Sequence, residues 1–256
     1  MRFYAFAEGH KYPLVKITEL KKLNKIEYDS AIIDVGVYDL VCKYKDKPFP
    51  KERLEKTFEV LDSNELDKRW LVATADYPAL PKEHGINIDY DNVKESLNNW
   101  YYYAKAKNWK QGIFTLQTQS ITDYDQIISD YMKFPLQLNG EEIPYIGIGS
   151  LCRLVKNKKD EKELFRKLLQ FVRERYPKSH IHVWGASKWH IEALYQYADS
   201  FDSTKWTRAP TSKLKKKYGK NCKNREQRKI FFDTYYEGIM TYKSQNKLDQ
   251  YAEDRQ

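Results

Sequence analysis

The sequence has little cysteine and no long hydrophobic run. Its three cysteines, Cys42, Cys152 and Cys222, are far apart and form neither a CxxC pair nor a Cys/His zinc spacing. We therefore expect no disulfide framework and no metal site, which suits a reducing compartment. No apolar stretch approaches the ~20 residues that cross a bilayer, and the first residues, MRFYAFAEGHKYP, lack a signal-peptide core. These absences predict a cytoplasmic protein without a membrane partner.

Glycine-rich phosphate-binding loops are missing as well. The chain has ten glycines, and none of them falls into a GxGxxG or Walker-type pattern. A dinucleotide or nucleoside-triphosphate site is therefore disfavoured, and we predict no cofactor.

Hydrophobic residues make up 41% of the 256 positions and aromatic residues 15%, which is typical of a globular chain. This length allows one large α/β domain or two small ones. Because neither an internal repeat nor a low-complexity linker is present, a single domain over 1–256 is favoured.

Positive charge is concentrated in one segment. The formal net charge is +9, and residues 205–229 alone contain eleven Lys or Arg against the single acid Glu226. The rest of the chain is therefore near neutral. Clustered cations suit a nucleic-acid backbone, because each phosphate contact releases counterions. A solvated loop that only keeps the protein soluble is the other interpretation.

Short strand-like runs alternate with amphipathic stretches of ten or more residues. This switch in periodicity is typical of βα units. Strands are predicted at 30–36, 70–75, 112–116, 144–148, 181–185 and 198–201. Helices are predicted at 51–61, 92–107, 124–133, 161–174, 187–197 and 224–249. Such units either close into a barrel or form an open doubly wound sheet.

Polar or small residues lie near the carboxyl ends of all six predicted strands. In an α/β barrel the chemistry gathers at the carboxyl ends of the strands, which is where these residues fall. We therefore predict a TIM-type (β/α) barrel, either complete or irregular and reduced, followed by C-terminal helices over 224–250. The strand-end residues are Asp34, Asp76, Gln117, Gly149 with Ser150, Gly185 and Asp202.

The same strand ends, taken in order, resemble those of the tRNA-guanine transglycosylase superfamily, whose members exchange a guanine in a polynucleotide for a 7-deazaguanine. The resemblance spans about 30–206 and includes an Asp-x-Phe-Asp nucleophile segment. The similar segments are Ile32–Tyr38, Ala73–Pro78, Gly112–Gln117, Ile146–Leu151, His182–Gly185 and Asp199–Asp202.

The sequence also departs from the family pattern. Val35 and Val37 replace a Ser and a Gly, and Thr118 begins the pair that stands where two glycines are usual. The Cys/His zinc site of the tRNA-acting enzymes is missing, since only Cys222 follows the nucleophile segment. The Phe-Asp-Ser-x-x-Trp segment ending at Trp206 is more similar to the branch that places 7-deazaguanines in DNA. A DNA substrate is therefore preferred over RNA.

The resemblance implies a role for each strand end. Asp202 would be the nucleophile that attacks the sugar C1′, and Asp34 the general acid and base. Asp76 and Gln117 would read the edge of a purine. The remaining base-binding residues would be Gly149, Ser150 and Leu151 through their backbone N–H groups, Tyr38 and Trp184 by stacking, and Gly185.

The implied partners are DNA or RNA, a guanine or preQ0/preQ1-like base, and a partner subunit or a second copy. The residues expected to contact the nucleic-acid backbone are Lys205, Arg208, Lys215, Lys216 and Lys217. Two alternatives remain open. One is a nucleic-acid-binding relative or subunit without turnover, and the other is an unrelated barrel hydrolase that acts on a free nucleoside or sugar. The basic segment argues against the hydrolase. Asp199 is interpreted as a supporting carboxylate.

Overall fold

The computed structural model describes most of the chain. The described residues are 1–5, 10–36, 51–77, 91–149, 159–186, 190–203, 207–208 and 210–253, and for 159 and 243–253 only the backbone is described. Four predicted site residues, Tyr38, Ser150, Leu151 and Lys205, lie outside these ranges.

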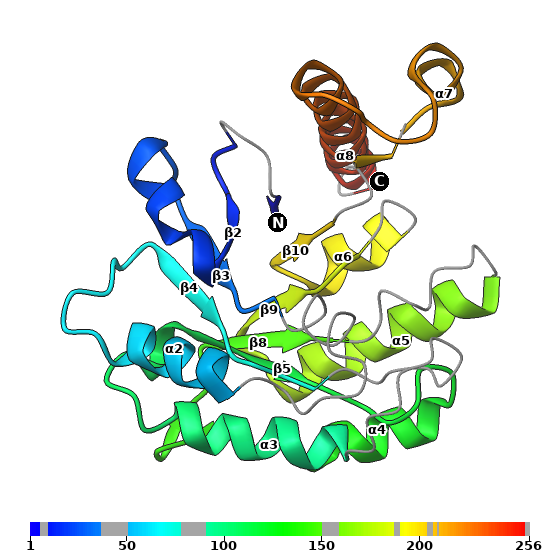
Figure 1. Ribbon diagram of the computed structural model, residues 1–256. Coiled ribbons are helices and arrows are strands. Elements are labelled where there is room, and N and C mark those ends of the chain that lie inside the picture. The colour runs from blue at the N-terminus through cyan, green and yellow to red at the C-terminus, as the bar shows by residue number, and fades with distance from the viewer. Residues whose placement is uncertain are drawn as a thin grey trace.

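Eight parallel strands form an α/β barrel of the TIM type, as the sequence predicts (Figure 1). The strand order is β1-β10-β9-β8-β5-β4-β3-β2, and a parallel bridge between Ala5 and Pro13 brings the outer strands β1 and β2 together. The strands are β1 Arg2–Tyr4, β2 Leu14–Lys16, β3 Ala31–Asp34, β4 Trp70–Ala73, β5 Gly112–Leu116, β8 Tyr145–Ile148, β9 His180–Val183 and β10 Ser200–Asp202.

Helices cover the outside of the barrel, and two further helices follow the last strand (Figure 1). Asp side chains cap two of the outer helices: Asp91 accepts from the N–H of Lys94, and Asp123 from that of Gln126. The helices are η1 Ile17–Lys25, α2 Lys51–Asp62, α3 Asn92–Tyr103, η3 Trp109–Gln111, α4 Tyr124–Met132, α5 Lys159–Arg175, α6 Ile191–Tyr197, α7 Ser212–Tyr218 and α8 Arg225–Glu253.

The expected strands and helices are present, with a few additions. The elements β1, β2 and η1 were not predicted from the sequence. The two strands have three residues each, which is too short to show a period. Helix α7 was predicted only as a basic segment, since its lysines hide the single apolar position Leu214. The other additions are η3 and a small hairpin of β6 Gln137–Leu138 and β7 Glu141–Glu142. Asn139 and Gly140 turn it with φ angles of 54° and 77°.

Side chains alternate between the barrel interior and the helical shell. Tyr4, Leu14, Ile32, Leu71 and Ile113 form one buried cluster, and residues one position away, such as Val15 and Ile33, join the larger core. The β5, β9 and β10 side of the interior is polar instead. It contains Thr115, His180, His182, Ser200 and Asp202, which occupy alternate positions on their strands. A polar interior is costly unless its groups pair with one another, so this side of the barrel is a place to look for function.

Helix α8 is attached to the barrel beside β1 and β10. Its buried residues Phe231, Tyr235 and Ile239 repeat every four positions and form one face. Phe3 of β1 packs against Tyr235 at a ring distance of 5.8 Å, and the Tyr235 hydroxyl donates to Ser203 Oγ at 3.3 Å. These contacts hold the C-terminal helix next to the residue that follows Asp202.

Candidate active site at the carboxyl ends of the strands

The predicted site residues that the structure describes converge on one end of the barrel. Asp34 and Asp202 are the last residues of β3 and β10, and Gln117 and Gly149 directly follow β5 and β8. Asp76 lies three residues beyond β4, and Gly185 two residues beyond β9. Because all eight strands are parallel, these residues share the carboxyl-end mouth.

Asp34 and Asp76 form a carboxylate pair on one side of the mouth. Burial and the neighbouring Asp34 charge raise the pKa of Asp76 to about 7, although the Gln117 amide opposes the shift by donating Nε2–H to Asp76 Oδ2. Asp34 is oriented by the backbone, since its Oδ1 accepts the N–H of Gly36 at 2.8 Å. Near neutral pH one member of the pair therefore exchanges a proton readily.

Gly149 has a steric role that the sequence did not suggest. A Cβ at this position would overlap the Gln117 amide, so a larger residue here would require the Gln117 side chain to move. The Gly149 N–H donates to the Leu116 carbonyl at 3.1 Å within the sheet. The predicted donation to a purine from backbone N–H groups around Gly149, Ser150 and Leu151 stays a prediction.

Asp202 is 7% exposed and is held from two directions. Its Oδ1 accepts the N–H of Gly185 at 2.8 Å, and His182 Nε2 lies 3.4 Å from the same oxygen. Gly185 adopts a φ of 64°, which favours glycine. The Gly185 N–H thus orients Asp202, and the predicted contact of Gly185 with a base stays a prediction.

Trp184 is fixed by contacts inside the barrel. Its Nε1–H donates to Thr115 Oγ1 at 3.0 Å, and its ring meets His182 edge-on at 4.2 Å. Gly147 makes room for it, since a Cβ there would lie 2.5 Å from Trp184 Nε1. The predicted stacking of Trp184 on a base stays a prediction.

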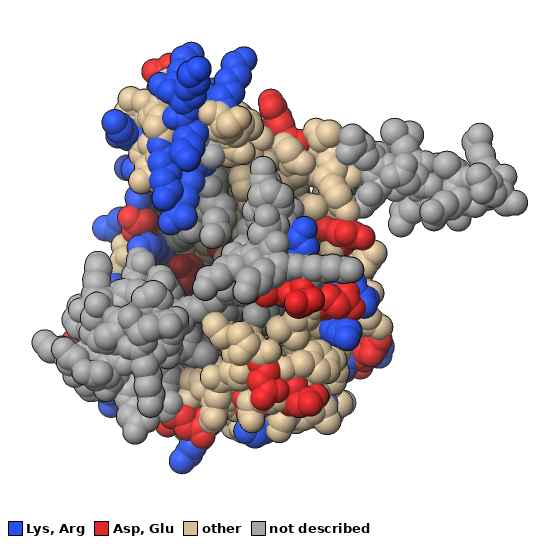
Figure 2. Space-filling view, turned by 90° about the vertical axis from the view of Figure 1, so that its right-hand side faces the viewer, with Lys and Arg blue, Asp and Glu red and all other residues tan. Residues whose placement is uncertain are grey.

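The basic segment lies on exposed helices beside the mouth. Thr211 caps α7 by accepting from the N–H of Leu214, and the side chains of Arg208, Lys215, Lys216 and Lys217 are all exposed. Figure 2 shows Lys and Arg gathered in a column over α7 and the start of α8, with acidic atoms in a hollow below them. Tethering α8 to Ser203 keeps this column near Asp202.

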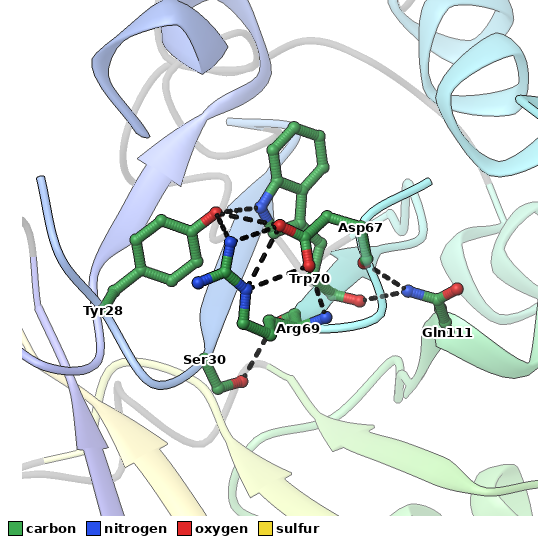
Figure 3. Close-up of polar contacts among 6 residues, drawn as sticks. All are labelled: Tyr28, Ser30, Asp67, Arg69, Trp70 and Gln111. Carbon is green, nitrogen blue, oxygen red and sulfur yellow. Dashed lines mark hydrogen bonds and ion pairs between the residues drawn. The ribbon is translucent and has the colours of Figure 1, made fainter. Parts of the chain in front are cut away.

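The opposite end of the barrel has a structural network instead. Arg69 contacts Asp67 through several hydrogen bonds and lies over the Tyr28 ring, whose hydroxyl also accepts from Trp70 Nε1 at 2.7 Å (Figure 3). Gln111 joins the network through the carbonyls of Asp67 and Trp70. A pocket of about 380 Å³ opens beside it. Most of these polar groups are paired with one another, which suits a stabilising role at this end.

The sequence reading did not assign a role to His182, Ser200 or Lys16. The alternate positions of His180 and His182 on one strand are the sequence signal that both side chains face the same side of the sheet. Lys16 is the register partner of Asp34 across β2 and β3. Within the described ranges, no three His, Cys, Asp or Glu side chains come together as a metal-ligand group.

The fold and the mouth define an α/β barrel with carboxylates at its carboxyl end. The chain matches no protein-family model, and no curated protein is significantly similar to it. Of the helices in the described part of the chain, none combines the length and the apolar character that crossing a bilayer requires.

Proposed function

We propose that this protein exchanges a guanine in a polynucleotide, DNA in preference to RNA, for a 7-deazaguanine through a covalent glycosyl–Asp202 intermediate. The observation that carries the proposal is the shared mouth: a fixed carboxylate on β10 faces the same opening as the Asp34–Asp76 pair. Exchange at C1′ needs both a nucleophile and a group that moves a proton on the base, and this mouth offers both.

The reaction consists of two displacements. In the first, a carboxylate oxygen of Asp202 bonds to C1′ while the C1′–N9 bond breaks, and the departing guanine takes up a proton. In the second, the nitrogen of the incoming base bonds to C1′, the C1′–O bond breaks, and the base gives up its proton. Two inversions give net retention, as in retaining glycosidases. The target nucleotide must first be flipped out of its stack to reach the mouth.

Asp34 transfers the proton in this scheme, and Asp76 reads the base. A purine such as guanine presents an N1–H and an exocyclic amine, and an ionised Asp76 accepts from both. Burial and the Asp34 charge raise the pKa of Asp76 to about 7, and hydrogen bonds from the two donors of a bound purine would favour the ionised form. Gln117 already orients Asp76 and can turn its carbonyl oxygen towards the base.

The exposed lysines of α7 supply the attraction for the polymer. Arg208, Lys215, Lys216 and Lys217 are exposed, and contacts of their charges with phosphates would give salt-dependent affinity. A neutral nucleoside would gain nothing from such a surface, so the polymeric substrate is favoured over a free one.

A relative that binds nucleic acid without turnover is the second candidate. One observation favours it: two groups predicted to read the base are engaged within the protein, because the Gln117 amide donates to Asp76 and the Gly149 N–H bonds to Leu116. The inactive protein would use the same basic helices and the same mouth.

Labelled guanine separates the two candidates. The protein is incubated with radiolabelled guanine and either duplex DNA or tRNA, and label in the polymer is counted. Exchange that is lost in Asp202→Asn, with a denaturation-resistant adduct seen only for the unmodified chain, supports the proposal. Tight, salt-sensitive binding without exchange or adduct supports the inactive relative. Exchange that survives in Asp202→Asn overturns the nucleophile assignment.

A further inference from the structure

A chain of polar side chains runs through the barrel interior beneath Asp202. His182 Nδ1 lies 2.8 Å from Ser200 Oγ, and the same oxygen lies 2.7 Å from His180 Nε2. At the other side of its ring, His182 Nε2 lies 3.4 Å from Asp202 Oδ1. This row of polar side chains therefore connects the mouth of the barrel with the end where β9 begins.

His182 is fixed in place with one nitrogen aimed at Asp202. The side chain is fully buried, and its Nε2 makes no hydrogen bond of ordinary length. Trp184 packs edge-on against the ring at 4.2 Å, and Tyr4 does so at 5.8 Å. A buried polar atom without a partner is costly, so its persistence beside a carboxylate calls for a functional explanation.

The surroundings determine which atoms carry the protons. A carboxylate oxygen accepts hydrogen bonds, so the position of Nε2 beside Asp202 assigns the His182 proton to Nε2 and leaves Nδ1 to accept from the Ser200 hydroxyl. Ser200 Oγ then accepts from His180 Nε2–H. Burial lowers the pKa of His180 to about 4, with the nearby Asp199 opposing that shift and His182, Arg2 and Arg173 adding to it. A neutral His180 is compatible with this direction of donation. Around His182 itself the titratable groups are Asp202, His180 and Tyr4.

From this geometry we infer that His182 is a positioning residue that holds Asp202 Oδ1 and thereby presents Oδ2 as the attacking atom. The Gly185 N–H already occupies Oδ1 at 2.8 Å, and the His182 Nε2–H approaches the same atom. With both donors on one oxygen, the carboxylate cannot rotate freely. This inference rests on the proposed function, because it assigns the atoms of that reaction.

His182 also assists the second displacement. Once Oδ2 is bonded to C1′, Oδ1 is the carbonyl oxygen of a glycosyl ester. When the incoming base displaces Oδ2, the electron pair of the breaking bond returns to the carboxylate, and both donors stabilise the charge that develops there. The separation of 3.4 Å is that of the free carboxylate, so His182 acts on Oδ1 through its dipole rather than through a short hydrogen bond, and this attraction grows from the ester to the re-forming carboxylate.

Two His182 substitutions test the inference by single-turnover kinetics. His182→Leu removes the donor and is expected to slow adduct formation and breakdown by about 10²-fold, with the apparent KM for the polynucleotide changed less than about twofold. His182→Gln restores an N–H near Nε2 and should recover at least about tenfold of that loss. His10→Gln is the matched control, because His10 is also a buried histidine but packs against Phe3 and α8 rather than against Asp202. Equal rates for the Leu and Gln variants, or a rate for the Leu variant like that of the unmodified chain, overturn the inference.

A second measurement does not depend on turnover. Nitrogen-15 NMR of the unmodified protein reports the tautomer of His182, and the inference requires the proton on Nε2. An Nδ1–H tautomer overturns it even if exchange is observed. An Nε2–H tautomer in a protein that shows neither exchange nor adduct leaves the positioning contact intact and refutes the proposed function instead. Thermal unfolding of the Leu and Gln variants shows whether each is folded.

Discussion

Asp199 and Asp202 are three residues apart and lie at opposite ends of β10. Asp202 ends the strand at the mouth, whereas Asp199 precedes it and pairs with Arg173 at 2.5 Å. Although burial opposes its ionisation, the Ile181 N–H and the Arg173 guanidinium hold the pKa of Asp199 below its ordinary value of 3.8. Two acids that look alike in the sequence therefore differ in their surroundings and in their expected function.

Substitution by Asn should affect activity at Asp202 and stability at Asp199. Asp202→Asn is expected to lower guanine exchange by at least about 10³-fold while leaving the fold intact. Asp199→Asn should keep exchange but lower the free energy of unfolding by about 1–2 kcal/mol, a value reduced because the ion pair is partly exposed. Because the pKa of Asp199 is depressed, this loss is present above pH 3.8 and disappears in acid. Exchange assays and urea unfolding at pH 7 measure both effects; an unstable but active Asp202→Asn variant would contradict the assignment.

Asp76 gives the opposite pH dependence. Its pKa is raised from 3.8 to about 7, so the native chain binds this proton more tightly than the unfolded chain does. The contribution of Asp76 to the free energy of unfolding therefore falls as the pH rises from about 4 to about 7. Asp76→Asn removes this fall in the free energy of unfolding. The variant should therefore unfold at a higher urea concentration than the unmodified protein at pH 8, but not at pH 4.

Asp125→Asn is the control for Asp76, since it removes an exposed carboxylate in the first turn of α4. It should produce no comparable gain at pH 8. A gain of equal size in both variants would mean that overall charge, rather than burial beside Asp34, explains the effect.

Gly149→Ala tests the close approach of β8 to Gln117. The added Cβ would overlap the Gln117 amide, so Gln117 must give up its contact with Asp76 or β8 must shift. We expect a loss of about 1–3 kcal/mol in the free energy of unfolding, together with impaired exchange. Gly238→Ala on the exposed side of α8 meets no atom within 4 Å and should stabilise the helix by about 0.5–1 kcal/mol. Differential scanning calorimetry of the two variants shows whether the loss of stability is specific to glycine replacement at the mouth.

The α7 lysines should set the salt dependence of polymer binding. Replacing Lys215, Lys216 and Lys217 by Ala removes up to three phosphate contacts, and the slope of log K against log salt should become shallower by up to about 2.7 on B-DNA. The control replaces Lys105, Lys107 and Lys110, exposed lysines near the start of β5 and thus at the other end of the barrel. Fluorescence anisotropy at several salt concentrations compares the two triple variants. If the slope of log K against log salt becomes shallower by the same amount in both variants, the attraction comes from net charge rather than from α7.

Much of the barrel could be predicted because its local patterns are strong. Runs such as 112–116 are short and contain β-branched and aromatic residues, and the helix at 159–175 has a clear apolar stripe. The predicted bounds of both elements therefore lie within two residues of the observed ends. The strands at Arg2–Tyr4 and Leu14–Lys16 were missed, because three residues leave no measurable period and only pairing with distant strands makes them extended.

The sequence by itself determined the order of strands and helices and put Asp34, Gln117 and Asp202 at strand ends. That order follows from local periodicity and from the parallel connections, which need no knowledge of distant contacts. Only the tertiary structure decided that Asp199 faces Arg173, that the Gly149 and Gly185 N–H groups are engaged, and that His182 points at Asp202. These relationships join residues of different strands. Strand register and closure of the barrel set them, and no local pattern records either.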